Sequence, residues 1–406
     1  MLESPMRIGR RALLGGMAGA APIRAARAQN AGAIKIGVLN DQTGPYADLA
    51  GPGSVVAAKL AVADVGNAVL GRPLEVIVGD HQNKPDIGAA LVREWFGTGD
   101  VRMVADFANS AVSLAAQPLA RQYDRIVMHV SSTSSTLAGS GCSPNGFQWA
   151  QNTQSDAAAL FRPLLTSGKT SYFFVTVDYV FGISVEQDAK AVIEAGGGRV
   201  LGAVRHPLGN ADFASYLETA RASGAQVVAF ADSGNDMSTA VKQANEFGLA
   251  PRQALAAPIA YLTDIHALGL QAAQGLQFAQ SWYWDLDDRT RAWAQRFHAQ
   301  TSRMPTDLQA GVYSATLHYL KAVQKAGTTD TQAVIAAMKA LPVEDMYTQN
   351  GRILANNKMA FDQYLMRVKA PAQSRGAWDL LEVVAKVPAG EAFRAADQSG
   401  CAMAKG

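Results

Sequence analysis

Residues 101–137 read VRMVADFANSAVSLAAQPLARQYDRIVMHVSSTSSTL, and the expected fold follows from this stretch. Two short apolar runs, Val101–Ala105 and Ile126–Val130, are typical of buried strands. Between them, Ala111–Tyr123 has the spacing of an amphipathic helix. A strand, a helix and a second strand in this order predict one unit of a doubly wound parallel sheet.

Small polar residues follow each of these two strands. Asn109 and Ser110 come after the first strand, and Ser131–Thr133 come after the second. Ligands of doubly wound sheets bind beyond the carboxyl ends of the strands. Hydroxyls and free N–H groups at a helix start suit an anion such as a carboxylate. The alternative interpretation, that Ser110 only caps the following helix, fits this stretch equally well.

The residues before this stretch form two similar units. Ile34–Leu39 and Pro73–Asp80 are predicted strands, and Ser54–Val65 and Lys84–Phe96 are predicted helices. A turn rich in Gly and Pro follows the first strand and places Tyr46 at the mouth of the sheet. The first lobe is therefore expected to be α/β with a parallel sheet.

The same order of elements restarts after residue 151. The predicted strands are Ser171–Val177, Arg199–His206 and Gln226–Ala231, and the predicted helices are Ser155–Leu165, Gly182–Glu194, Asp212–Ala222 and Ser238–Phe247. A polar turn, Asp232–Asp236, follows the third strand. Two α/β lobes with facing carboxyl-end loops define a ligand cleft.

The chain is then expected to cross between the lobes several times, as in a hinge. Gly275–Trp284 is predicted to be extended, and Met359–Val368 is predicted to be a strand of a hairpin. Asp288–Thr301, Leu308–Lys325 and Thr331–Ala340 are predicted helices. The predicted parts are an export signal at 1–28, a first lobe at 29–151 and 283–350, a second lobe at 152–282 and 351–385, and a tail at 386–406 that returns to the first lobe.

The N-terminal segment is typical of an export signal. Arg10 and Arg11 precede an apolar run, and small residues surround Arg27, which together predict export by the twin-arginine route. Residues 1–28 carry five Arg and one Glu, so a total formal charge of +2 leaves −2 on the remainder. No basic patch indicates nucleic-acid binding, and no later run has the ~20 apolar residues of a membrane span.

The two cysteines, Cys142 and Cys401, lie in loops rich in small residues, and a disulfide between them is expected in an exported chain. The sequence contains no GxSxG elbow, HExxH motif, phosphate loop or GxGxxG motif. The six His are scattered and none is at ligand spacing from a cysteine. We therefore expect no enzyme activity, no metal and no cofactor.

With both lobes placed, the chain closely resembles periplasmic solute-binding proteins of the branched-chain amino-acid type. The resemblance rests on five segments in the same order: IKIGVLNDQTGPYA, VDYVFG, KQANEFGL, GLQFAQSWYWDLDD and AGVYSATLHYLKAV. It implies the type I periplasmic-binding fold, two lobes that close on a small molecule, and partner permease and ATPase subunits of an ABC transporter. It also implies a periplasmic location.

The resemblance assigns the carboxylate of the ligand to Ser110, Ser131 and Thr133. The chain departs from the amino-acid binders where they bind the ammonium of the ligand, because Ile259 takes the place of their acidic residue. Asp232 and Asp236 are the alternative counter-ions, and without one a buried ammonium is strongly disfavoured. Tyr46, Phe181 and Trp282 are candidates for stacking on a ring, whereas Trp284 is expected in the core. The expected ligand-binding residues are Tyr46, Asn109, Ser110, Ser131, Ser132, Thr133, Phe181, Asp232, Ser233, Ile259 and Trp282.

These residues favour a small carboxylate that lacks an α-amine, and an aromatic acid fits best. A branched-chain amino acid and urea or a short amide are the alternative ligands. The alternative function is a ligand-sensing subunit of a receptor.

Overall fold

The structure is a computed structural model that describes residues 1–2, 32–249 and 252–405. The fold described below belongs to the unit Ala33–Gly406. Almost all of the predicted export signal lies outside the described residues. The expected fold class, α/β lobes with parallel sheets, is confirmed.

The first lobe is built on a six-stranded sheet in the order β2-β3-β1-β4-β5-β6, parallel except for β2. Its strands are β1 (Ile34–Asn40), β2 (Ala68–Val69), β3 (Arg72–Asp80), β4 (Val101–Asp106), β5 (Ile126–His129) and β6 (Gly146–Gln148). Because β1, β4 and β5 are neighbours, the loops that follow them meet at one edge.

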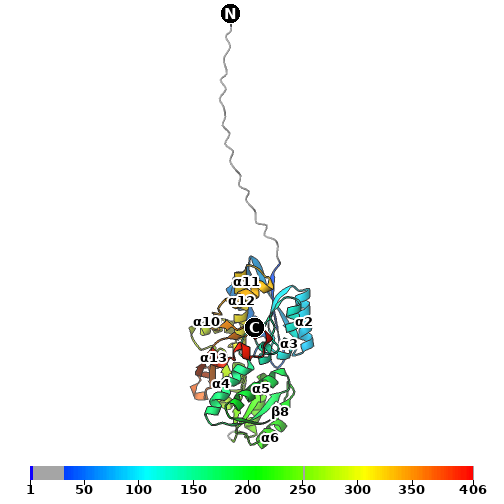
Figure 1. Cartoon of the computed structure of the whole chain (residues 1–406). Coiled ribbons are helices and arrows are strands. Elements are labelled where there is room, and N and C mark those ends of the chain that lie inside the picture. The colour runs from blue at the N-terminus through cyan, green and yellow to red at the C-terminus, as the bar shows by residue number, and fades with distance from the viewer. Residues whose placement is uncertain (3–31, 250–251, 406) are drawn as a thin grey trace. The chain divides into compact units, whose positions relative to one another are not determined.

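Helices cover both faces of this sheet. They are α1 (Gly51–Asp64), α2 (Pro85–Gly97), α3 (Ser110–Gln122), α10 (Asp288–Thr301), α11 (Asp307–Ala326) and α12 (Thr331–Ala340). On one face, α1 packs against α10 and α11, and on the other α2 packs beside α3 (Figure 1). The faces alternate along β1: Ile36 and Val38 belong to the first core, whereas a Cβ on Gly37 would lie 2.5 Å from the Trp95 ring.

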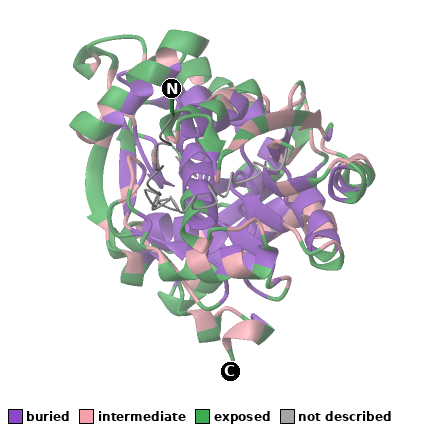
Figure 2. Ribbon diagram, turned by 90° about the horizontal axis from the view of Figure 1, so that it is seen from above, coloured by how far each residue is buried: buried purple, intermediate pink, exposed green. Residues whose placement is uncertain are grey.

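The second lobe is built on a parallel four-stranded sheet in the order β10-β9-β7-β8. Its strands are β7 (Ser171–Val177), β8 (Arg199–His206), β9 (Val227–Ala231) and β10 (Ala254–Ala256). Its helices are α4 (Thr153–Thr166), α5 (Val180–Ala195), α6 (Ala214–Ala222), α7 (Gly234–Glu246), α8 (Leu262–Leu268) and α9 (Leu270–Ala273). The central strands of both sheets are buried, and exposed residues gather on the outer helices (Figure 2).

The C-terminal part forms two small antiparallel sheets. One contains β11 (Gln277–Gln280), β14 (Gln363–Val368) and β15 (Leu381–Val387), and the other pairs β12 (Arg352–Ile353) with β13 (Met359–Ala360). The predicted strand Met359–Val368 is therefore two strands, because a break at Phe361–Asp362 separates β13 from β14. The remaining elements are the 3₁₀ turns η1 (Ser135–Ala138), η2 (Pro371–Gln373), η3 (Ala396–Gln398) and η4 (Ala402–Ala404), and helix α13 (Ala389–Ala392).

A buried polar network joins three segments that connect the lobes. Asp307 accepts hydrogen bonds from Gln151 Nε2 at 2.9 Å and from the Ser281 backbone N–H at 3.2 Å. The Tyr347 hydroxyl donates to Ser281 Oγ at 2.6 Å. Because these four residues are far apart in sequence, the network fixes the crossing segments against one another, as a hinge requires.

The expected disulfide between Cys142 and Cys401 is confirmed, with the two Cα atoms 5.7 Å apart. Between β15 and Cys401, the tail contacts α4 of the second lobe, where the Arg394 N–H donates to Gln154 Oε1 at 3.0 Å. The tail therefore runs from the second lobe to the loop that carries Cys142 in the first. The exact lobe boundaries given above stay a prediction.

Candidate functional site

The loops after β1, β4 and β5 of the first lobe form what we call the first wall of the site. Asn109 caps α3: its Oδ1 accepts from the N–H groups of Ala111 at 2.9 Å and Val112 at 3.3 Å. Ser110 is the first residue of α3, and its hydroxyl accepts from the Ser134 N–H at 3.3 Å. The helix cap is therefore Asn109, which leaves the backbone N–H of Ser110 without a partner inside the helix.

The first two hydroxyls after β5, those of Ser131 and Ser132, have different partners. The Ser131 hydroxyl donates to Asp106, a fully buried carboxyl at the end of β4, which also accepts from Asn40 Nδ2 at 2.6 Å. Burial raises the pKa of Asp106, and these hydrogen bonds oppose the rise. The Ser132 hydroxyl donates to the Phe107 carbonyl and accepts from Ser113 at 2.7 Å. Both serine hydroxyls therefore bond within the first lobe.

Thr133 differs from the two serines before it. Its carbonyl accepts from the Thr153 N–H at 2.8 Å, which fixes the backbone. Within residues 32–249 and 252–405, no residue forms a hydrogen bond with its hydroxyl, although Thr133 is only 1% exposed. A buried hydroxyl without a protein partner is available to a ligand or to water.

The loops after β7, β9 and β10 of the second lobe form the second wall, and two contacts join it to the first. The Tyr46 hydroxyl lies 2.7 Å from the Tyr179 hydroxyl. Burial, followed by the charges of Tyr179 and Asp232, raises the pKa of Tyr46, so both phenols stay protonated. Gly234 has φ +66°, and a Cβ there would lie 3.1 Å from the Pro45 carbonyl oxygen and 3.3 Å from the Tyr46 ring.

Two predicted apolar residues of the second wall, Phe181 and Ile259, are buried. Phe181, on the first turn of α5, is buried with its ring 5.7 Å from that of Tyr179. Ile259 is 1% exposed and belongs to the same hydrophobic cluster as Tyr46 and Phe181.

Trp282 was predicted in the site and Trp284 in the core, and both tryptophans are hydrogen-bonded. Trp282 packs edge-on against Trp293, and its Nε1 donates to the Met346 carbonyl at 3.1 Å. Its ring therefore packs against the helix α10 of the first lobe. Trp284 is partly buried against the cores of both lobes, and its Nε1 donates to the Trp378 carbonyl at 3.1 Å.

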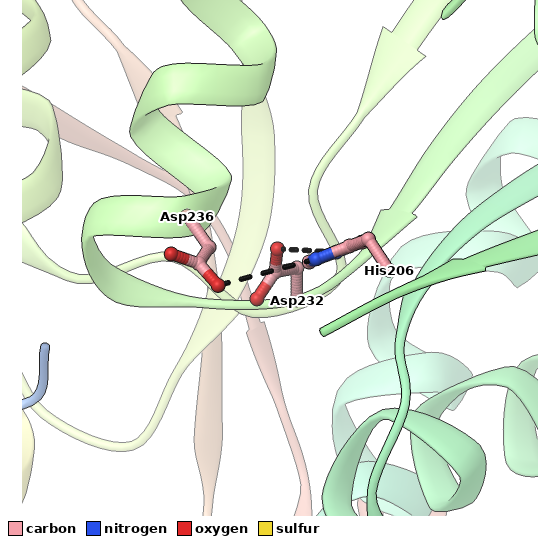
Figure 3. A group of neighbouring side chains, drawn as sticks. All are labelled: His206, Asp232 and Asp236. Carbon is pink, nitrogen blue, oxygen red and sulfur yellow. Dashed lines mark ion pairs between the residues drawn. The ribbon is translucent and has the colours of Figure 1, made fainter. Parts of the chain in front are cut away.

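A buried charged cluster lies directly behind Ser233 and Gly234 in the second wall, and we call it the His206 cluster (His206, Asp232 and Asp236; Figure 3). His206 ends β8, Asp232 follows β9, and Asp236 is in the first turn of α7. His206 Nε2 lies 3.0 Å from Asp232 Oδ2, and Nδ1 lies 4.0 Å from Asp236 Oδ2. Sequence analysis did not identify His206, although its position at a strand end was a usable signal.

Hydrogen bonds hold both aspartates on the second lobe. Asp232 Oδ1 accepts from the Ser233 N–H at 2.8 Å, and Asp236 Oδ2 accepts from the Gly209 N–H at 2.7 Å. Burial and the charge of Asp232 raise the pKa of Asp236 to about 6. Burial also raises the pKa of Asp232, whereas its bond to His206 opposes that rise. One ligand atom from each of the three side chains lies within 4.8 Å of the other two. A small cation or a proton could bind between these atoms.

Comparisons with known proteins identify the class. The family described as "Periplasmic binding protein" matches residues 33–376, and the chain belongs to it. The Leu/Ile/Val-binding protein homolog 6 of Brucella abortus is 29% identical over 212 residues, which are 52% of this chain and 54% of that protein. The chain thus spans about half the length of this curated relative.

Two solved structures cover nearly the whole fold. A periplasmic binding protein from Burkholderia mallei is 40% identical with a TM-score of 0.89, over 91% of this chain and 99% of that one. A branched-chain amino-acid ABC transporter periplasmic ligand-binding protein from Burkholderia xenovorans is 37% identical with a TM-score of 0.82, over the same shares of the two chains.

The family, the relative and the two structures are all described as binding proteins. The expectations of a solute-binding protein of the type I periplasmic fold, and of no enzyme, are confirmed by this membership. Within the described residues, no helix has both the length and the apolar character needed to cross a membrane.

Proposed function

We propose that the chain is the extracytoplasmic solute-binding component of an ABC uptake transporter that captures a small carboxylate without an α-amine, with aromatic acids preferred. The observation that carries this proposal is a free hydroxyl, that of Thr133, in the first wall, combined with apolar side chains in the second wall. Phe181 and Ile259 of the second wall are buried in the same hydrophobic core as the Tyr46 ring of the first wall. Such a site matches a molecule with one anionic end and one apolar end.

The carboxylate belongs on the first wall. The Thr133 hydroxyl has no protein partner, and the N–H of Ser110 starts a helix of 13 residues, where the helix dipole favours negative charge. The Ser131 hydroxyl donates to Asp106. The Ser131 hydroxyl is therefore not free for the ligand, and Ser131 instead helps to shape the loop that carries Thr133.

The apolar end belongs between the walls. Phe181 and Tyr46 are aromatic, and Ile259 adds a branched aliphatic surface, which suits a planar ring. This fold is compatible with such a ligand: a solute-binding protein from Rhodopseudomonas palustris, 19% identical to this chain with a TM-score of 0.81, was solved in complex with benzoate. At this identity the likeness concerns the fold alone.

The transporter partners and the export route complete the proposal. The relative from Burkholderia xenovorans is described as part of an ABC transporter, which supports permease and ATPase subunits as partners. Arg10 and Arg11 support twin-arginine export to the periplasm. Replacing both by Lys should leave the protein in the cytoplasm, and unchanged periplasmic yield would exclude this route.

A thermal-shift screen of the purified protein tests the ligand class. It includes benzoates, phenylpropenoates, branched-chain amino acids, urea and short amides. A ligand at 100 times its dissociation constant stabilises the folded state by about 2.7 kcal/mol. Stabilisation by aromatic acids supports the proposal, whereas stabilisation only by amino acids, urea or amides contradicts it.

A further inference from the structure

The His206 cluster brings a histidine next to the two acids of the turn after β9. His206 Nδ1 lies 3.0 Å from the Pro207 carbonyl, which can only accept, so Nδ1 carries a hydrogen. The other ring nitrogen, Nε2, faces Asp232 Oδ2 at 3.0 Å. Both atoms are completely buried, and neither has another hydrogen-bond partner within the described residues.

Two lone pairs at this distance in a buried site repel each other unless a proton lies between them. With that proton, the pair is an imidazolium beside a carboxylate and its net charge is zero. The rings of Phe213 and Tyr216 pack edge-on against His206 at 4.8 and 5.9 Å and exclude water from it. His206 is therefore positioned as the internal counter-ion of Asp232.

The pair is adjacent to the cleft. Asp232 is followed directly by Ser233 and Gly234, and Gly234 touches Pro45 and Tyr46 of the first wall. Burial, and after it nearby charges that include Asp232, raises the pKa of the Tyr46 and Tyr179 phenols. An unpaired carboxylate at this position would therefore act on a ligand held between the walls.

We propose that His206 determines ligand specificity: by neutralising Asp232, it removes the charge that an α-ammonium would need, so the site accepts carboxylic acids and rejects α-amino acids. This inference rests on the proposed function and names the residue that enforces it.

Two further acids near His206 and the second wall accept hydrogen bonds from backbone N–H groups of the second lobe. Asp236 accepts from the N–H groups of Gly209 at 2.7 Å and Asn210 at 3.4 Å. Asp264 accepts from the Tyr261 N–H at 2.9 Å, and burial raises its pKa to about 7. The exposed ion pairs of Arg205 with Asp178 and Glu186 lie on the outer side of β8.

The test compares the native protein with His206→Gln and with His206→Gln/Asp232→Asn. Gln can still donate a hydrogen bond to Asp232 but carries no charge, so the single variant exposes the negative charge and the double variant removes it again. Calorimetry measures two ligand pairs that differ only in the α-amine: leucine with 4-methylpentanoate, and phenylalanine with 3-phenylpropanoate.

The native protein is expected to prefer the acids. His206→Gln should shift the preference toward the amino acids by roughly tenfold or more, and the double variant should return to the native preference. A purely structural role of His206 would lower both affinities without this reversal. An unchanged preference in folded His206→Gln overturns the inference, and so does a shift that persists in the double variant.

Two further measurements make the result independent of the variant's folding. Nitrogen NMR of the native protein should show the His206 ring protonated on both nitrogens at pH 7, and an unprotonated Nε2 overturns the inference. Elemental analysis should find no stoichiometric metal, because a bound cation would replace the proton as counter-charge. Native binding of leucine but not of 4-methylpentanoate contradicts the proposed function itself, an outcome distinct from failure of the His206 variants.

Discussion

The two lobes end their central strands with different chemistry at the same place. In the first lobe, hydroxyls follow β5, and the acid that ends β4, Asp106, is held by Ser131 and Asn40. In the second lobe, an acid follows β9, and a histidine from β8 neutralises it. Each lobe therefore uses its buried acid internally. Within the described residues, each lobe also holds a buried hydroxyl without a protein partner, that of Thr133 in the first lobe and that of Ser233 in the second. A polar side chain at the end of a strand is therefore not always available to a ligand, because it can be bonded within its own lobe.

The lobes also differ in their buried titratable groups. Burial lowers the pKa of His81 and His318 to about 4 and that of His129 to about 3, and all three pack with the first sheet. In the second lobe the pKa of His206 is raised by Asp232, although burial opposes this. The pKa of Asp236 is raised to about 6.

The largest expected effect is an opposite response of the lobes to acid. Below pH 6.5, unfolded chains protonate His81, His129 and His318 while the folded first lobe keeps them neutral. The first lobe should lose up to about 1.4 kcal/mol of stability per pH unit for each histidine. The second lobe should gain stability between pH 6 and 4, where folded Asp236 is protonated but unfolded Asp is still ionised. Hydrogen exchange, corrected for intrinsic rates, should show β4 and β5 losing protection at pH 5 relative to β7 and β9. Equal loss in both lobes would contradict this difference.

The second effect concerns the tail that connects the lobes. Cys142→Ser/Cys401→Ser should lower the free energy of unfolding by about 2–5 kcal/mol, because the disulfide closes a loop spanning both lobes. Urea unfolding with and without reductant measures it. The native protein should lose stability on reduction, whereas the double variant should not respond. A loss below about 0.5 kcal/mol would show that the tail docks without the bridge.

The third effect concerns the Thr133 hydroxyl of the first wall. Thr133→Val keeps the shape but removes the hydroxyl, and it should weaken carboxylate binding by about 1–3 kcal/mol. Thr133→Ser is the matched control and should retain most of the affinity. If Thr133→Val binds normally by calorimetry, the carboxylate lies elsewhere.

The smallest effect tests the contact between the walls. Gly234→Ala introduces strain of about 1–2 kcal/mol at positive φ, and its Cβ would also press on Pro45 and Tyr46. Gly248→Ala is the control, since Gly248 has φ +67° and no atom within 4 Å of a Cβ. Both variants should lose similar stability in urea, but only Gly234→Ala should lose affinity. Equal affinities would show that closure does not need this contact.

Much of the fold could be predicted from the sequence, since long periodic segments determine it. Ser171–Val177, Arg199–His206, Asp288–Thr301 and Thr331–Ala340 have the predicted bounds. The strands β6 and β10 were not predicted, because three residues are too few to show a period. The strand β15 was not predicted either, since its exposed Val383 and Val384 break the alternation of buried and exposed residues.

Helix α7 begins at Gly234, four residues before its predicted start. Gly, Asn and Asp at 234–236 are typical turn residues, and tertiary packing overrides that preference.

The candidate site was predictable only in part. The loops after β4 and β5 were identified. The sequence does not show, however, which of the three consecutive hydroxyls of Ser131, Ser132 and Thr133 stays free for a ligand. Their partners, Asp106 and Phe107, come from another strand and decide which hydroxyl stays free. His206 was missed for the same reason, since its role depends on Asp232 in a different strand.

The central claim is that the site binds a carboxylate that has no α-amine. Calorimetric titration of the native protein with 3-phenylpropanoate and phenylalanine tests it most directly, because the two molecules differ only in that amine. We expect 3-phenylpropanoate to bind and phenylalanine to bind at least roughly tenfold more weakly. Tight binding of phenylalanine with no binding of 3-phenylpropanoate would contradict it.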